Sequence, residues 1–79
     1  MKFYDIDGGV FYTLQDIKND FTEFKAEDPE NYEQYETFTV YLPVLMMDTI
    51  NGRNDLEIVG LTPDEIERLI NALFKKVGL

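Results

Sequence analysis

The sequence contains no cysteine, histidine, serine or tryptophan. Without cysteine the chain can form neither a disulfide nor a thiolate nucleophile. Without histidine and serine it lacks the groups of Ser-His and Cys-His catalysis and of the usual zinc sites. Carboxylates, lysine, tyrosine and threonine are left, and a domain of 79 residues rarely encloses a substrate cavity of about 300 Å³ or more. We therefore expect a protein that is not an enzyme and that binds no metal or cofactor.

Long hydrophobic runs are also missing. The longest, residues 40–47, is interrupted by Pro43 and is far shorter than the ~20 residues that span a bilayer. The first nine residues, MKFYDIDGG, hold one lysine and two aspartates and lack the apolar stretch of a signal peptide. We therefore expect a soluble, cytoplasmic protein that does not enter a membrane.

Basic residues are few, since seven stand against sixteen acidic ones and give a net charge of −9. Direct binding to nucleic acid or to an anionic membrane is not expected, because those partners require a basic face. A basic protein surface is a compatible partner. The length predicts one domain, residues 1–79, whose modest core relies on the eleven aromatic residues.

The segment KFYDIDGGVFYT, residues 2–13, predicts a β-hairpin. Aromatic and β-branched residues flank the Asp-Gly-Gly of residues 7–9, where glycine supplies the positive φ of tight hairpin turns. A two-residue turn gives an apolar face of three residues: Tyr4, Ile6 and Phe11. A three-residue loop gives a face of four: Tyr4, Ile6, Val10 and Tyr12. We favour the three-residue loop because it collects more apolar area on one side.

Thr13 followed by Asp16 predicts a helix N-terminus with a capping box. Behind it, apolar residues recur at helical spacing and form a stripe that can pack on the sheet: Leu14, Ile17, Phe21 and Phe24. Asp28-Pro29 ends this helix, because a residue before proline avoids the helical conformation. Asp28 is then placed to cap a short turn that begins at Pro29.

Residues 37–50, TFTVYLPVLMMDTI, fit two kinds of element. Their β-branched and aromatic content favours a strand. However, apolar residues also fall at helical spacing behind a cap at Thr37: Phe38, Tyr41, Leu42, Leu45 and Met46. Pro43 suits neither element, because it removes a ladder donor from a strand and costs about 3 kcal/mol inside a helix. We favour a helix, either a short one that starts at Pro43 or a longer one kinked there.

The last third of the sequence predicts a turn at residues 51–54, a third strand in DLEIVG (55–60) and a C-terminal helix. Thr62, Pro63 and Glu65 form the start of this helix with a second capping box. Its apolar face holds six residues: Ile66, Leu69, Ile70, Leu73, Phe74 and Val77. The fold class is therefore α+β. The hairpin and a third strand form a small antiparallel sheet, packed by two or three helices in the order β-β-α-(α)-β-α.

Most of the negative charge lies in residues 16–36, where eight acidic residues and two lysines give a net charge of −6. On a helix, four carboxylates recur at spacings of four, three and four and share one side: Asp16, Asp20, Glu23 and Glu27. Lys18 and Lys25 fall on the opposite flank of the apolar stripe. Such a row can imitate a phosphate backbone and attract a basic protein surface. The simpler alternative is an ordinary solvated helix face.

The charge continues into ENYEQYE, residues 30–36, where two tyrosines alternate with acids. Tyrosine is a preferred interface anchor, although two tyrosines three residues apart can equally lay their rings on the core. The candidate partner-binding residues are Asp16, Asp20, Glu23, Glu27, Glu30, Tyr32, Glu33 and Tyr35.

Several short stretches together resemble a known group of proteins. They are FYT (11–13), LQDIKNDF (14–21), Phe38-x-x-Tyr41-Leu42, Asn51-Gly52 and LEIV (56–59). The pattern resembles small, acidic, uncharacterised proteins carried by phages and conjugative elements of Gram-positive bacteria, from whose smoother helical pattern Pro43 departs. The resemblance implies no catalytic residues. It implies a protein that inhibits host defence or nucleic-acid enzymes by contact, as anti-restriction and anti-CRISPR proteins do.

Two hypotheses follow. In the first, the chain is a non-catalytic interaction module whose acidic, DNA-mimic-like helix face binds a host nucleic-acid-binding or defence protein. In the second, it is a structural or accessory protein that forms a homodimer through aromatic surface, and its acids serve only solubility. The two differ in salt response, because binding by charge weakens as ionic strength rises.

Overall fold

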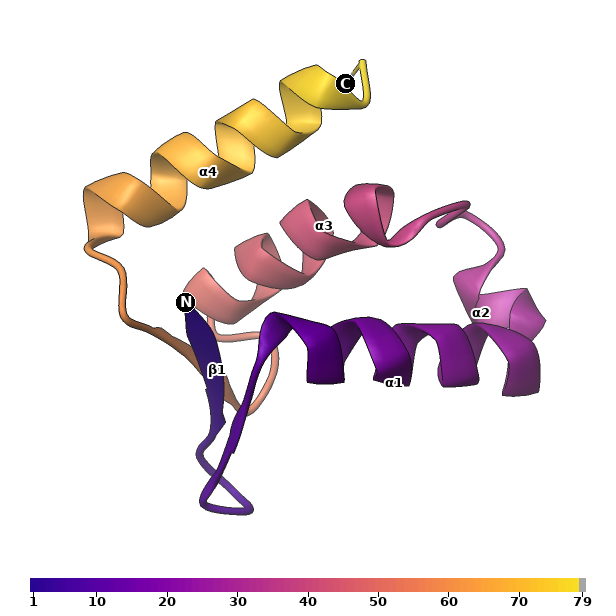
Figure 1. The fold of residues 1–79 in the computed structure, drawn as a ribbon, viewed down its shortest axis with the longest axis horizontal. Helices are drawn as coiled ribbons and strands as arrows, with labels where there is room; N and C mark the ends of the chain where they lie inside the picture. The colour runs from indigo at the N-terminus through magenta and orange to yellow at the C-terminus, as the bar shows by residue number, and fades with distance from the viewer. Residues whose placement is uncertain (79) are drawn as a thin grey trace.

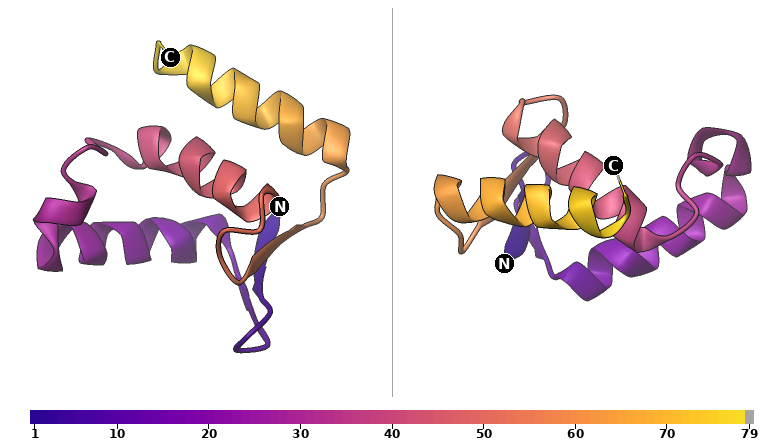
Figure 2. Two further views of the ribbon diagram at one scale, coloured as in Figure 1. Left: turned by 180° about the vertical axis from the view of Figure 1, so that it is seen from behind. Right: turned by 90° about the horizontal axis from the view of Figure 1, so that it is seen from above.

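The computed structural model describes residues 1–78. Its elements are β1 (Lys2–Asp5), β2 (Val10–Tyr12), α1 (Leu14–Glu27), α2 (Pro29–Tyr32), α3 (Phe38–Ile50), β3 (Leu56–Val59) and α4 (Pro63–Lys76). The predicted α+β class and order of elements are confirmed. The strands form one antiparallel sheet in the order β2-β1-β3. α3 lies between α4 and α1 (Figures 1 and 2).

The hairpin register differs from the favoured prediction. Phe3 pairs with Tyr12, Tyr4 with Phe11, and Asp5 with Val10. Tyr4 and Phe11 therefore share one face, with ring centroids 4.7 Å apart. A two-residue turn predicts this grouping, although the observed connection between the strands is residues 6–9, closed by a bond from the N–H of Gly9 to the carbonyl of Asp5 at 2.7 Å. The three-residue loop, which placed Val10 and Tyr12 beside Tyr4, is wrong.

Two effects select this register. The carboxylate of Asp5 accepts the backbone N–H groups of Asp7 and Gly8, both at 3.0 Å, and Gly9 adopts a φ of 67°. The second effect is tertiary, because Phe3 is fully buried in the core. Tyr12 pairs with Phe3 on the same face and packs against that core.

Both predicted capping boxes are present. The Thr13 hydroxyl accepts from the N–H of Asp16 (3.1 Å), whose carboxylate accepts from the N–H of Thr13 (2.9 Å). Thr62 and Glu65 make the same pair of bonds at 3.2 and 3.0 Å. These bonds hold the pKa of the Glu65 carboxyl below its ordinary value. The starts of α1 and α4 are thus set by local sequence.

α1 ends before Asp28-Pro29, as predicted, and α2 begins at Pro29. Asp28 occupies the N-cap position of α2 but makes no side-chain capping bond. Its carboxylate instead accepts from the side-chain amide of Asn31 at 2.7 Å. The expected cap is therefore replaced by a side-chain contact.

Residues 38–50 form one helix that contains Pro43, so the longer of the two helical alternatives is observed and no strand is formed there. Thr37 has the extended backbone of an N-cap, but its side chain makes no capping bond. Pro43 lacks an N–H group, so the carbonyl of Thr39 loses its helical partner. The Pro43 ring is fully buried, and burial of its apolar surface stabilises the helix in place of the lost bond.

One core joins the sheet to α1, α3 and α4. Its buried members are Phe3, Ile17, Leu42, Met46, Ile66 and Ile70. α4 rests mainly on α3, through the apolar stripe that its sequence predicts. Within residues 1–78, no helix has the length and hydrophobicity needed to cross a bilayer.

Candidate functional site

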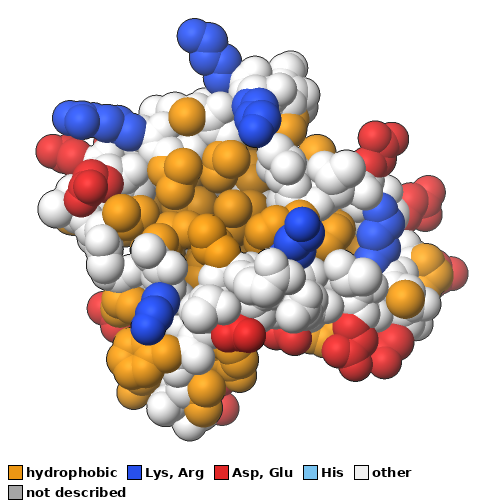
Figure 3. All heavy atoms as spheres, in the orientation of Figure 1, with side chains coloured by type: hydrophobic (Ala, Val, Ile, Leu, Met, Phe, Trp, Pro, Cys, Tyr) orange, Lys and Arg blue, Asp and Glu red, His pale blue; other side chains and the backbone are white. Residues whose placement is uncertain are grey.

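The six candidate carboxylates lie on α1, on α2 and just after α2. Five of them are exposed, and Asp20 is half-buried. Acidic side chains gather along the lower and right-hand margin of the molecule, where α1 and α2 lie (Figure 3). The acids that the sequence selected therefore lie on two contacting helices and the segment that follows them. We call the surface formed by Glu23, Glu27, Glu30 and Glu33 the acidic face.

The predicted row along α1 is not uniform. Asp16 is engaged in the capping box with Thr13. Asp20 lines a cavity of about 230 Å³ that also contains Asp5, Tyr12 and Tyr41. Glu23 and Glu27 make no hydrogen bond or ion pair within the described residues 1–78. The exposed carboxylates of α1 that have no hydrogen-bond partner therefore lie in its C-terminal half.

Lys25 forms no ion pair with these carboxylates. Its ammonium donates to the carbonyl oxygens of Tyr35 and Glu36, both at 2.7 Å, and lies 5.9 Å from the ring centroid of Phe21. The only ion pair in residues 1–78 joins Arg53, just after α3, to Asp48 near the end of that helix, at 3.6 Å. Lys25 thus ties the segment after α2 to α1, and the acidic face has no cationic partner in the described chain.

Behind the acidic face lies an aromatic cluster that joins α1, α2 and α3: Phe21, Phe24, Tyr32, Tyr35, Phe38 and Tyr41. Phe21 stacks on Tyr41 with centroids 4.7 Å apart, and Tyr35 meets Tyr41 edge-on at 5.2 Å. Tyr32 stacks on Phe24 at 5.9 Å. Tyr32 and Tyr35 are half-buried, so both rings pack internally and neither is a freely projecting anchor.

Among the described residues 1–78, the phenol of Tyr41 has the largest pKa shift. Burial, together with the neighbouring Tyr32, Tyr35, Asp48 and Asp20, raises the pKa of its phenol to about 12. Since the ordinary value is 10.0, ionisation is harder in the folded state than in the unfolded state. Folding stability should therefore fall as pH rises from about 10 towards about 12.

An alkaline titration checks this. Followed by tyrosinate absorbance, one phenol should ionise later than the other four, and this late step should disappear in Tyr41→Phe. The same variant should lose much of the decline in stability over that pH range. A Tyr41→Phe titration that keeps the late step would contradict the assignment to Tyr41.

A second concave surface was not predicted from the sequence. It is a groove of about 950 Å³ between α3, β3 and α4. Its apolar lining includes Met47, Ile50, Leu56, Ile58, Ile66 and Ile70. The groove depends on how α4 sits against α3 and β3, and hydrophobic periodicity within one element carries no such information.

The described residues 1–78 hold no cluster of three or more acidic side chains placed to bind a metal ion. Comparison of the chain with protein-family models, with curated proteins and with solved structures gave no match.

Proposed function

We propose that this protein is a non-catalytic interaction module that binds a basic protein surface through its acidic face. The partner class is a nucleic-acid-binding or defence protein of a bacterial host, in keeping with the resemblance to proteins of phages and conjugative elements. The acidic face then occupies the basic groove of the partner, where the phosphate backbone of a nucleic acid would otherwise bind. The protein acts as an inhibitor by occupying that groove.

The observation that carries this proposal is the absence of a cationic partner for the acidic face within residues 1–78. The nearby Lys25 is committed to the backbone carbonyls of residues 35 and 36. Unpaired carboxylates of one sign produce a negative potential that steers a basic partner and speeds its association.

The aromatic cluster supports this function by holding the acidic face in one shape. Phe24 and Tyr32 join α1 to α2, and Tyr35 meets Tyr41 of α3. A surface that is already ordered loses less conformational entropy on binding. In this proposal Tyr32 and Tyr35 act mainly by positioning the acids.

Charge reversal tests the proposal. Glu23→Lys with Glu27→Lys should weaken binding of a partner captured from a bacterial lysate at least tenfold, which is about 1.4 kcal/mol. Capture by the unmodified protein should also be lost at about 1 M salt, where the screening length is about 3 Å. Duplex DNA should compete with the protein for the captured partner.

The matched control is Asp7→Lys with Asp55→Lys, which makes the same change in net charge at two exposed positions away from α1 and α2. This control should retain the partner. Equal losses in both double variants would show a general effect of net charge. Capture that is unaffected by salt and by reversal at Glu23 and Glu27 would overturn the proposal.

A second candidate, self-association, is favoured by exposed apolar side chains. Phe11 is 59% exposed and Phe24 is 43% exposed, and hydrophobic side chains gather at the centre of the face in Figure 3. Sedimentation distinguishes the two candidates. A tight homodimer that buries the region of Tyr32 and Tyr35, without a salt-sensitive partner, would support self-association, with the acids serving only solubility.

A further inference from the structure

β3 is an edge strand that pairs only with β1. The N–H of Ile6 donates to the carbonyl of Asp55 at 2.9 Å. Hydrogen-bonded and non-hydrogen-bonded pairs alternate along an antiparallel ladder. In the observed register, Glu57 lies opposite Tyr4 and Val59 opposite Lys2, so Glu57 and Val59 bond to β1. The N–H and C=O groups of Leu56 and Ile58 therefore point away from β1.

One of these outward groups is already used. The N–H of Leu56 donates to the side-chain oxygen of Asn54 at 3.1 Å. Asn54 in turn donates to the hydroxyl of Thr49, which donates to a carbonyl of α3. Ile58 has no such arrangement, and its outward N–H and C=O find no partner among residues 1–78. An unpaired edge of this kind is a template for an added strand.

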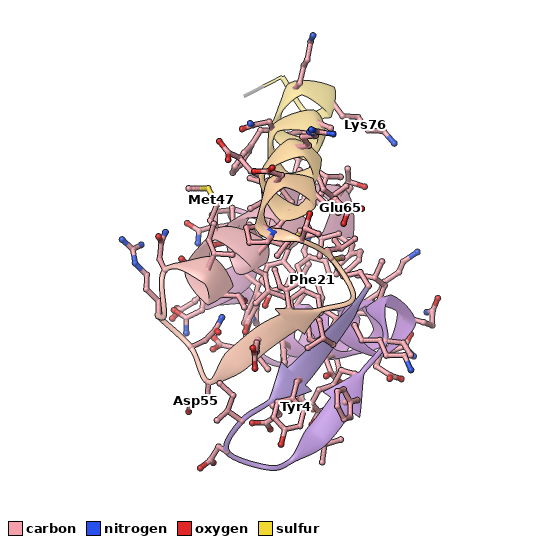
Figure 4. All side chains as sticks on the ribbon, turned by 90° about the vertical axis from the view of Figure 1, so that its left-hand side faces the viewer. Tyr4, Phe21, Met47, Asp55, Glu65 and Lys76 are labelled. Carbon is pink, nitrogen blue, oxygen red and sulfur yellow. The ribbon has the colours of Figure 1, made fainter. Side chains whose placement is uncertain are left out.

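The groove runs along this edge. Leu56, Glu57 and Ile58 all line it, although successive side chains of a strand point to opposite faces. A concave surface that contacts three consecutive residues must follow the edge of the strand. Its other walls come from α3 and α4, including Met47 and Asn71. Figure 4 shows β3 at the margin of the sheet, with Asp55 at its start and Met47 above it.

The charges of the groove favour a basic occupant. Its only charged lining residues are Glu57 and Glu67. They also disfavour a second copy of this chain. Pairing two β3 strands so that Leu56 of one copy lies opposite Ile58 of the other places the two Glu57 side chains directly across from each other, and like charges in that position are destabilising.

We propose that the open edge of β3 binds an extended segment of a partner protein as a fourth strand. The segment alternates apolar residues, which enter the groove, with lysine or arginine, which faces Glu57 and Glu67. Four residues of β3 (Leu56–Val59) span about 13 Å, enough to pair with four or five residues. Recognition by strand addition takes affinity from the backbone and specificity from alternate side chains. This site is independent of the proposed function, since none of its lining residues belongs to α1 or α2.

The probe for this site is a blocked hexapeptide of alternating valine and lysine, titrated into isotope-labelled protein and followed by amide NMR. We expect a dissociation constant below about 1 mM, with the largest shifts at Ile58 and Glu67 and slower hydrogen exchange at the Ile58 amide. The same peptide with N-methyl groups on its valines should bind at least tenfold more weakly if the valine N–H groups bond to β3. The isomeric peptide, with N-methyl groups on its lysines instead, should then bind with an affinity much closer to that of the unmethylated peptide.

Paired variants locate the binding. Glu57→Lys with Glu67→Lys should weaken the peptide at least tenfold, whereas Glu23→Lys with Glu27→Lys, an equal charge change on α1, should not. Both double variants alter exposed residues, and their amide spectra report whether the fold is kept. Three results would each overturn the inference: binding that is indifferent to all N-methylation, binding lost only in the α1 variant, or a helical bound peptide. A protein that dimerises alone with a protected Ile58 amide would assign the edge to a second copy and also overturn it.

Discussion

Phe21→Ala is expected to lower the free energy of unfolding by about 3–5 kcal/mol. Phe21 is only 5% exposed, and its ring contacts those of Tyr32, Phe38 and Tyr41. Removing it leaves a cavity where α1, α2 and α3 meet. Small domains are stable by only about 5–15 kcal/mol, so this variant should be largely unfolded at modest urea concentrations.

Phe24→Ala is the matched control, because Phe24 lies on the same helix and belongs to the same cluster but is 43% exposed. Phe24→Ala should lower the free energy of unfolding by only about 1 kcal/mol. Urea denaturation followed by circular dichroism measures both variants. Equal losses would mean that the cluster does not connect α1 to α3 through Phe21.

Met46→Ala is the second large expected effect, with a loss of about 2–5 kcal/mol. Met46 is fully buried between the sheet and the helices, whereas the adjacent Met47 is 39% exposed. Met47→Ala should therefore cost less than about 1 kcal/mol. Because the two variants remove the same atoms from neighbouring positions, their difference reports which side of α3 faces the core.

The same denaturation experiment tests this pair. A greater loss for Met47→Ala than for Met46→Ala would require α3 to be rotated about its axis, and it would contradict the observed burial of Met46. Met47 also lines the groove. Met47→Ala should thus preserve the fold while removing part of the wall beside β3.

The sequence by itself determined the features that depend on neighbouring residues. Thr13 with Asp16, and Thr62 with Glu65, set the starts of α1 and α4, because a capping box satisfies helix N–H groups within one turn. Asp28-Pro29 ended α1 because proline acts on the residue before it. The apolar periodicity of α4 and the strand at residues 56–59 were likewise local patterns, and together they sufficed for the fold class.

The tertiary structure decided whatever depends on a distant neighbour. The hairpin register reflects the burial of Phe3 in addition to the local bonds of the Asp5 carboxylate, although total apolar area on one face favoured the other arrangement. Residues 38–50 form a helix whose inner side buries Pro43 and Met46 in the core. Intrinsic β-propensity does not include the free energy gained by that burial. The structure also separated the predicted acidic row into a capping residue, a half-buried Asp20 and the outward-facing Glu23 and Glu27. The groove beside β3 exists only where three elements meet, so no periodicity within one segment could indicate it.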